Sequence, residues 1–236
     1  MRKNTKVKIK KAYIFIYLIL ILSIILSLVY IINFFLLKNE AIEESNLLNN
    51  YSTEIIEENL KEETNLITND ISNQTTKEET ERMIKVKKLK EINSDIVGWI
   101  EIENTNISYP VLQGTDNEYY MTHNYKKEKS RNGSIFLTRE YDWIIPSTNL
   151  LIYGHNLNNG TMFQDLLKYT NKSFYNQHPI IRFTTMEEDA EYEIISVFKS
   201  RVYYKSEKNV FRYYYFINAK TEEEYNQFVT DAKKAS

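Results

Sequence analysis

The chain has 236 residues and a formal net charge of −2, with 30 Lys and Arg residues against 32 Asp and Glu residues. This balance lacks the excess of basic residues that nucleic-acid binding needs, so no nucleic-acid partner is predicted. Cysteine is absent, which excludes a disulfide, a thiolate metal site and a cysteine nucleophile made from these residues. The 19 Tyr and 11 Phe residues favour β-structure, and the length allows one ordinary domain with additional segments.

The first 37 residues have the pattern of a membrane anchor. Residues 1–11 are rich in Lys and Arg, and residues 12–37 form an apolar run without a charge. At about 1.5 Å per residue this run is long enough to cross a hydrocarbon core of about 30 Å. It is too long for the apolar region of a cleavable signal peptide, and no small-residue cleavage site follows it. We therefore expect a single-pass anchor in the cell membrane, with residues 1–11 cytoplasmic and the rest extracellular.

Residues 38–93 are expected to form a polar, helical stalk. They are rich in Glu, Asn and Thr and contain no Gly or Pro. Apolar residues recur at spacings compatible with a helix, but no heptad persists, so a coiled coil is not predicted. A second helix is expected over residues 77–92, with a basic run from Arg82 to Lys90. We favour the solvated face of a helix packed on the domain for this run, with contact to an anionic cell envelope as the alternative.

Residues 94–236 are predicted to be one mainly β domain. Alternating and apolar runs indicate six strands, at residues 96–102, 107–112, 134–137, 150–153, 180–184 and 191–198. Helices are expected over residues 162–169 and 221–234, each begun by a capping box, Thr161 with Gln164 and Thr221 with Glu224. A sheet with a few short helices is typical of a small barrel or sandwich.

His155 is the candidate residue for proton transfer. It follows the apolar strand at residues 150–153 in the stretch Tyr153-Gly154-His155-Asn156. A histidine at the end of a buried strand has a fixed position, which acid/base catalysis needs before a tuned pKa. The alternative is a histidine that only ends the strand. His123, His155 and His178 are 32 and 23 residues apart and match no metal-ligand spacing, so neither a metal nor a cofactor is expected.

Several segments, in this order, resemble the sortases, and class B sortases above all. They are Asp95–Ile100, Ile107–Val111, Asp116–Tyr120, Gly133–Phe136, Leu151–Asn156, Gly160–Phe163 and the late helix Thr221–Lys234. The resemblance covers about residue 90 to the end of the chain. It implies a sortase-type β-barrel with short helices, preceded here by the transmembrane helix and the helical stalk.

The resemblance implies a membrane-anchored transpeptidase. A cysteine thiolate would cleave a C-terminal sorting motif, Asn-Pro-x-Thr-Asn or Ser/Asn-Pro-x-Thr-Gly, in secreted surface proteins. An amine of the cell-wall peptide or of lipid II would then accept the surface protein. The sorting peptide, this amine and the membrane are thus the implied partners. His155 matches the acid/base histidine of the family, and Tyr153 is expected to line the substrate groove.

The sequence departs from the family in its last part. The family's Thr-Leu-x-Thr-Cys motif and its arginine lie on the seventh and eighth strands, after the late helix, whereas this sequence ends at Ser236. Arg182, Arg201 and Arg212 all precede that helix. We therefore expect a class B sortase truncated before its last two strands and inactive as given. The alternative is a non-catalytic sortase-like module that binds sorting peptides or another partner; a merely structural stalk protein does not explain the order of the motifs.

Overall fold

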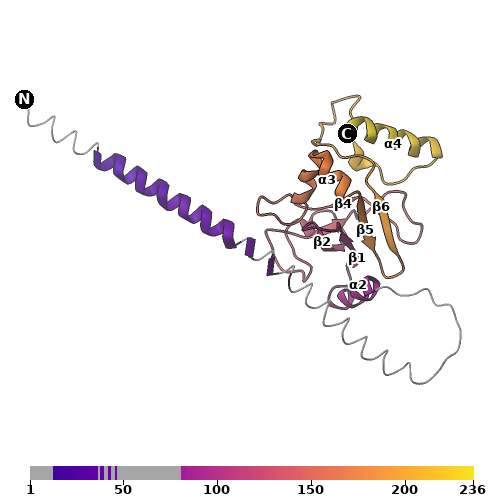
Figure 1. Cartoon of the computed structure of the whole chain (residues 1–236), viewed down its shortest axis with the longest axis horizontal. Coiled ribbons are helices and arrows are strands. Elements are labelled where there is room, and N and C mark those ends of the chain that lie inside the picture. The colour runs from indigo at the N-terminus through magenta and orange to yellow at the C-terminus, as the bar shows by residue number, and fades with distance from the viewer. Residues whose placement is uncertain (1–12, 37, 40–41, 44–45, 47–80) are drawn as a thin grey trace, which may run out of the picture.

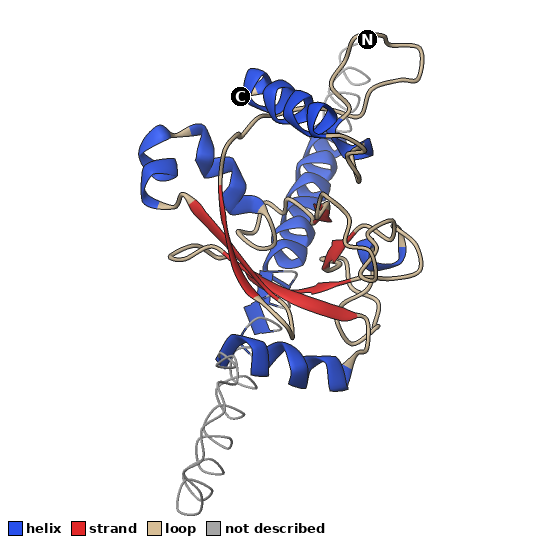
Figure 2. Ribbon diagram, turned by 90° about the vertical axis from the view of Figure 1, so that its right-hand side faces the viewer, coloured by secondary structure: helices blue, strands red, loops and turns tan. Residues whose placement is uncertain are grey.

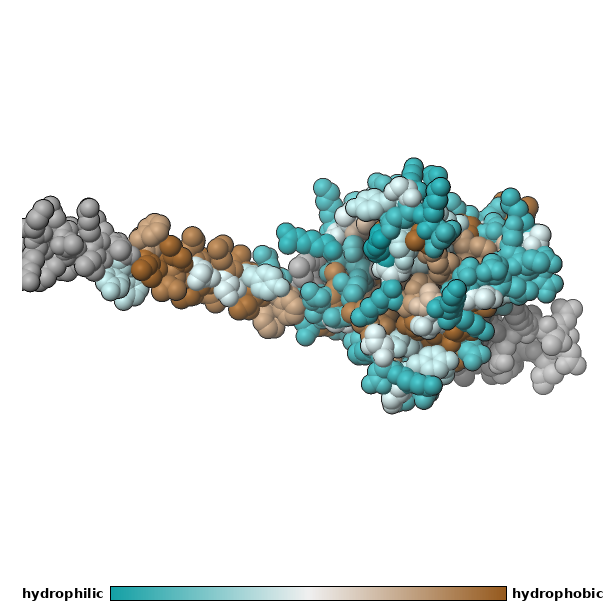
Figure 3. All heavy atoms as spheres, turned by 90° about the horizontal axis from the view of Figure 1, so that it is seen from above, coloured by the Kyte–Doolittle hydropathy of each residue, from teal (hydrophilic) through white to brown (hydrophobic). Residues whose placement is uncertain are grey.

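A computed structural model describes residues 13–36, 38–39, 42–43, 46 and 81–236 of the chain. One helix among them, Tyr13–Leu36, is long and apolar enough to cross a membrane by its length of 24 residues and its composition. Its visible face in Figure 3 is largely apolar. The helix lies within the predicted anchor, residues 12–37. The predicted cytoplasmic tail and most of the predicted stalk, residues 47–80, lie outside the described residues.

Helix α2 (Glu81–Ile92) lies beneath one face of the domain, within the predicted helix at residues 77–92 (Figure 2). It buries Met83, Val86 and Leu89, which are spaced three residues apart and so share one side of the helix. The guanidinium of Arg82 lies 3.4 Å from carboxylate oxygens of both Glu101 and Asp189. Part of the basic run therefore holds the helix to the sheet.

The domain is built on one sheet of six strands in the order β4-β3-β2-β1-β5-β6, which curls into a half-barrel (Figures 1 and 2). β2 and β3 pair in parallel, and the other neighbours are antiparallel. β4 and β6 are thus the two edges of the sheet. The strands are β1 (Ile96–Glu101), β2 (Ser108–Leu112), β3 (Ile135–Leu137), β4 (Ile152–Tyr153), β5 (Ile180–Thr184) and β6 (Asp189–Glu193).

Side chains that alternate along the strands form a hydrophobic core on each face of the sheet. One core, which includes Ile100, Val111 and Ile135, also takes in the segment around Met162 and Tyr169. The other contains Trp99 and Phe136, with Val86 and Leu89 of α2. Pro110, which cannot donate a backbone hydrogen bond, lies where β2 pairs with β1 and before the β2–β3 ladder begins at Val111.

Short helices connect and cover the strands. They are the 3-10 helices η1 (Tyr119–Met121), η2 (Gln164–Thr170) and η3 (Tyr213–Tyr215) and the α-helices α3 (Lys172–Gln177) and α4 (Glu222–Ala235). The predicted N-cap of α4 is confirmed, because the Thr221 hydroxyl accepts the N–H of Glu224 at 3.2 Å, while the Glu224 carboxylate accepts the N–H of Lys220 at 2.8 Å rather than that of Thr221. α3 and α4 lie on the opposite side of the sheet from α2 (Figure 2).

Two predictions about these elements were wrong. The expected helix at residues 162–169 is a 3-10 helix that begins at Gln164, since Met162 has a φ of 55° and the Thr161 hydroxyl bonds Asn159 rather than a helical N–H. The expected strand at residues 191–198 ends at Glu193. Beyond that point the chain bonds α4 and Ser236: the N–H of Val197 donates to the Ser236 hydroxyl at 3.3 Å.

Candidate functional site

The candidate site lies at the end of β4, where Gly154 lets the backbone approach its neighbours closely. A Cβ at Gly154 would come within 2.3 Å of Ile135 Cδ1 and 2.6 Å of Phe163 Cδ2. No side chain fits there, so the strand end packs directly on the core. The next residue, His155, is half-buried. In the Gly-His pair, Gly154 thus packs its backbone closely on the core, and the next residue carries the imidazole.

The backbone of His155 is held by the loop that returns after it. The N–H of Phe163 donates to the His155 carbonyl at 2.9 Å, and Asn156 forms an isolated antiparallel bridge with Met162. The Tyr109 hydroxyl on β2 accepts the N–H of Met162 at 3.0 Å, which ties this loop to the sheet. These bonds fix the position of the His155 main chain and so of the Cα that carries the imidazole, as acid/base catalysis requires.

The imidazole of His155 is oriented by a backbone carbonyl from a distant part of the chain. Its Nε2 lies 2.8 Å from the carbonyl oxygen of Met121, the last residue of η1. A carbonyl oxygen can only accept, so Nε2 carries the hydrogen of this bond. In the neutral ring Nδ1 is then the unprotonated nitrogen and can accept a proton. The arrangement gives His155 a defined acid/base atom.

Tyr153 lies two residues before His155 and on the other face of β4 from Ile152. Its ring stacks on that of Phe136, with 5.3 Å between centroids and 29° between planes. Burial raises the pKa of the Tyr153 phenol above its usual value, with smaller contributions from Glu140 and Tyr213. The side chain is half-buried, so part of it contacts the core and part is accessible.

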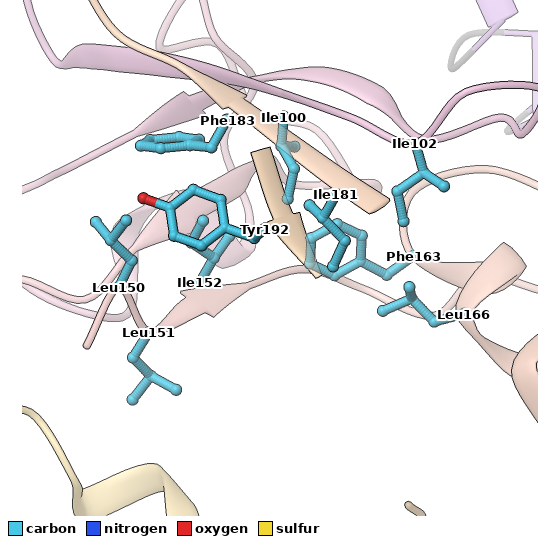
Figure 4. A pocket seen from close by; sticks show the side chains of 10 residues that line it. All are labelled: Ile100, Ile102, Leu150, Leu151, Ile152, Phe163, Leu166, Ile181, Phe183 and Tyr192. Carbon is cyan, nitrogen blue, oxygen red and sulfur yellow. The ribbon is translucent and has the colours of Figure 1, made fainter. Parts of the chain in front are cut away.

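An apolar hollow of about 330 Å³ lies against Ile152 of β4, on the face of the strand opposite Tyr153 (Figure 4). Its lining comes from β1, the approach to β4, η2 and the loop before it, β5 and β6: Ile100, Ile102, Leu150, Leu151, Ile152, Phe163, Leu166, Ile181, Phe183 and Tyr192. The N–H of Phe163, whose ring lines the hollow, donates to the His155 carbonyl, whereas the imidazole bonds η1 on the other face of the sheet. This hollow was not predicted from the sequence, although its lining includes the three consecutive apolar residues at 150–152.

The rings of the three histidines bond three different backbone carbonyls. His123 Nδ1 lies 2.8 Å from the Tyr119 carbonyl and its ring stacks on that of Tyr119, whereas His178 Nδ1 lies 2.9 Å from the Glu103 carbonyl. Within the described part of the chain, no three His, Asp or Glu side chains are grouped as metal ligands. Of the three, His155 bonds the Met121 carbonyl.

The three arginines singled out in the sequence are engaged elsewhere. Arg182 pairs with Glu191 on the neighbouring strand β6, and Arg201 pairs with Glu207. Arg212 donates to the carbonyl oxygens of Tyr204 and Glu207 at 2.8 and 2.7 Å. Arg182 thus joins two neighbouring strands, and Arg201 and Arg212 stabilise the loop around Glu207.

The comparisons with known proteins agree on one family. The model of the Sortase domain matches residues 100–230. The chain is 42% identical over 116 residues to sortase B of Listeria monocytogenes, which covers 49% of this chain and 47% of that relative. The chain spans about half the length of the curated relatives it matches.

Solved structures show the same similarity in three dimensions. The Staphylococcus aureus sortase B–substrate complex superposes with a TM-score of 0.58 at 32% sequence identity, over 64% of this chain and 67% of that one. A sortase B complexed with triglycine gives a TM-score of 0.65 at 26% identity, over 84% and 80% of the two chains. The half-barrel therefore has the sortase-like fold.

Proposed function

The chain belongs to the sortase family, and from this premise we propose that it carries the acid/base half of a class B sortase active site, with His155 as the acid/base. The observation that supports this role most is the bond from His155 Nε2 to the Met121 carbonyl, which leaves Nδ1 as the proton acceptor of the neutral ring. The side chain is half-buried at the end of β4.

His155 would act twice in the transpeptidation that we propose. A thiolate attacks the Thr carbonyl of the sorting motif, and the imidazolium then gives its proton to the departing amine as the thioester forms. An incoming amine loses a proton to the neutral imidazole as it displaces the thiol. These 236 residues contain no cysteine, so the thiolate must come from outside them, and we propose that the chain by itself is inactive.

The proposed substrates are a sorting peptide of the Asn-Pro-x-Thr-Asn or Ser/Asn-Pro-x-Thr-Gly type and an amine of the cell-wall peptide or lipid II. Two of the similar structures support both classes, one a sortase B–substrate complex and the other a sortase B with triglycine. Tyr153 would line the peptide groove with the exposed part of its ring. The reaction would join secreted surface proteins to peptidoglycan.

The proposed location is the outer face of the cell membrane. Residues 12–37 would span the bilayer once, with residues 1–11 cytoplasmic, residues 38–93 as a stalk and residues 94–236 as the extracellular sortase domain. The apolar helix Tyr13–Leu36 supports this arrangement, because its length suits a hydrocarbon core about 30 Å thick.

The first test uses the chain itself in detergent micelles with a fluorogenic sorting peptide. We expect no cleavage above the rate without protein, with or without added triglycine, because a hydroxyl would need far stronger activation than a thiol to attack the peptide. Thiol-independent turnover that disappears in a His155→Ala variant would contradict the proposed inactivity.

The second candidate function is a module that binds sorting peptides without cleaving them, which the absence of cysteine favours. Fluorescence anisotropy of a labelled sorting peptide separates the two candidates. Saturable binding to the chain, absent with a scrambled peptide and without any cleavage, would favour the binding module. No saturable binding is expected if the chain is only half of a catalytic site.

A further inference from the structure

Gly133 lies against the carbonyl group that orients His155. It has a φ of 59°, in the left-handed region that favours glycine. A Cβ built at Gly133 would lie 2.6 Å from the carbonyl oxygen of Met121 and 2.7 Å from that of Tyr120, where ordinary contacts begin at 3.4 Å. The Met121 carbonyl therefore occupies space that any other residue at position 133 would fill.

The segment that carries this carbonyl is tied down on both sides. Tyr120 is 1% exposed, and its hydroxyl donates to Asp95 at 2.7 Å. The N–H of Ser134 donates to the Tyr120 carbonyl at 2.8 Å, and the Ser134 hydroxyl donates to the His123 carbonyl, also at 2.8 Å. Because these bonds flank Met121, its carbonyl has little room to retreat from a new side chain.

We propose that Gly133 is a positioning residue for His155: by lacking a Cβ it lets the Met121 carbonyl accept the Nε2–H, and so fixes the neutral imidazole in the Nε2–H tautomer. The hydrogen bond between Nε2 and the Met121 carbonyl is 2.8 Å long. A Cβ at position 133 would lie 2.6 Å from the same carbonyl oxygen, which would have to move away to reach an ordinary contact of 3.4 Å. Such a shift would stretch or tilt the hydrogen bond to the limit of hydrogen bonding. Without this acceptor the ring is free to exchange between its two tautomers.

The consequence for catalysis rests on the proposed function of His155. With Nε2 committed to the carbonyl, Nδ1 is the nitrogen that exchanges protons with substrate, and the imidazolium keeps its Nε2 bond through both steps. Without the carbonyl acceptor, the neutral ring would have an unprotonated Nδ1 in only a fraction of the molecules. Such an effect lowers the turnover number more than the affinity for peptide.

The tautomer can be measured in the full chain without any activity, so it tests this inference separately from the proposed function. The chain has three histidines, and ¹⁵N-histidine labelling in micelles gives three imidazole patterns in a long-range ¹H–¹⁵N spectrum. His155→Gln identifies the signal of His155. At a pH above the histidine titration range, we expect a protonated Nε2 and an unprotonated Nδ1 for His155. An Nδ1–H tautomer, or an even mixture, would overturn the inference.

Gly133→Ala should convert His155 to a mixture of tautomers, while the patterns of His123 and His178 stay as they are. Gly133→Asn is the second variant, because Asn accepts a positive φ more readily than Ala and still brings a Cβ against the carbonyl. Gly114→Ala is the matched control: its Cβ would make an ordinary contact of 3.4 Å with Tyr120, near the same helix η1. If His155 keeps a single Nε2–H tautomer in a folded Gly133 variant, the positioning role is wrong.

Discussion

Lys85 is a cation inside the contact between α2 and the sheet. Its ammonium lies 3.3 Å from the ring centroid of Trp99, a residue that is 2% exposed. Burial lowers the pKa of Lys85 from 10.5 to about 8; Glu101 opposes this shift and Arg82 adds to it. Since the desolvation outweighs the attraction of Glu101, the charged form of this lysine costs stability in the folded state.

The stability of the domain should therefore rise with pH between about 8 and 10. In this window the unfolded chain still binds the Lys85 proton and the folded chain has lost it, so the free energy of unfolding increases. Urea titrations followed by tryptophan fluorescence should give a gain on the order of 1 to 2 kcal/mol from about pH 7.5 to about pH 9.5. Higher pH is avoided because burial raises the pKa of several tyrosines, Tyr120 among them, which reverses the trend above about pH 10.

Lys85→Met is the variant that isolates this contribution. It keeps a long, unbranched side chain over Trp99 and removes the titrating group, so its stability should change little over the same pH range. Lys87→Met, on the same helix, serves as the control and should keep the rise. A rise of equal size in Lys85→Met would show that another group causes it.

At the scale of single residues, the sequence made His155 the candidate acid/base, but it gave no indication of the groups that orient the ring. The glycine-histidine pair after an apolar strand was visible in the chain order. The acceptor of its Nε2–H is the Met121 carbonyl, 34 residues earlier, and every residue carries the same carbonyl. Only the folded arrangement of η1 and Gly133 distinguishes this one, so no side-chain pattern could have predicted it.

At the scale of elements, the two edge strands of the sheet are the feature with the clearest consequence. β4 and β6 each pair on one side in the described sheet, and the apolar hollow lies between them. Leu151 lines the hollow at its lower rim in Figure 4, with its side chain away from the packed centre. Unpaired edges beside exposed apolar side chains favour association with other chains.

An apolar fluorescent dye should report this hollow directly. We expect the chain, in micelles matched for detergent, to enhance dye fluorescence saturably, and Leu151→Asp to reduce the enhancement at least severalfold because a carboxylate is costly to bury there. Ile144→Asp is the matched control, since Ile144 is apolar and 93% exposed but does not line the hollow. Equal dye binding by both variants would mean that the hollow is not the site of dye binding.

The two predicted capping boxes show why one helix start was predicted correctly and the other was not. Both pairs have Thr followed three residues later by Glu or Gln, yet only the Thr221 hydroxyl caps a helix. At Thr161 the positive φ of Met162 interrupts the helical path, and the loop instead bonds back to His155 and Tyr109. Local sequence favours a helix there, but tertiary bonds of the candidate site override it.

At the scale of the whole molecule, the mainly β fold and its six strands followed from the sequence, whereas the order of the strands in the sheet did not. The ladder between β1 and β5 joins Trp99 to Thr184, across most of the domain. Alternation along a strand predicts which face is buried but not which strand is its neighbour. The hollow was missed for the same reason, because its lining comes from segments that are far apart in the sequence, from β1 to β6.

We propose His155 as the acid/base of a class B sortase site whose thiol lies outside these residues. The most direct test extends this chain after Ser236 with the C-terminal segment of the Listeria monocytogenes relative and measures cleavage of a sorting peptide. We expect thiol-dependent turnover that His155→Ala lowers by about 10² to 10⁴-fold, and His178→Ala, whose ring bonds the Glu103 carbonyl away from β4, by only a fewfold. A folded extended chain without turnover, or undiminished turnover without His155, would contradict this role of His155.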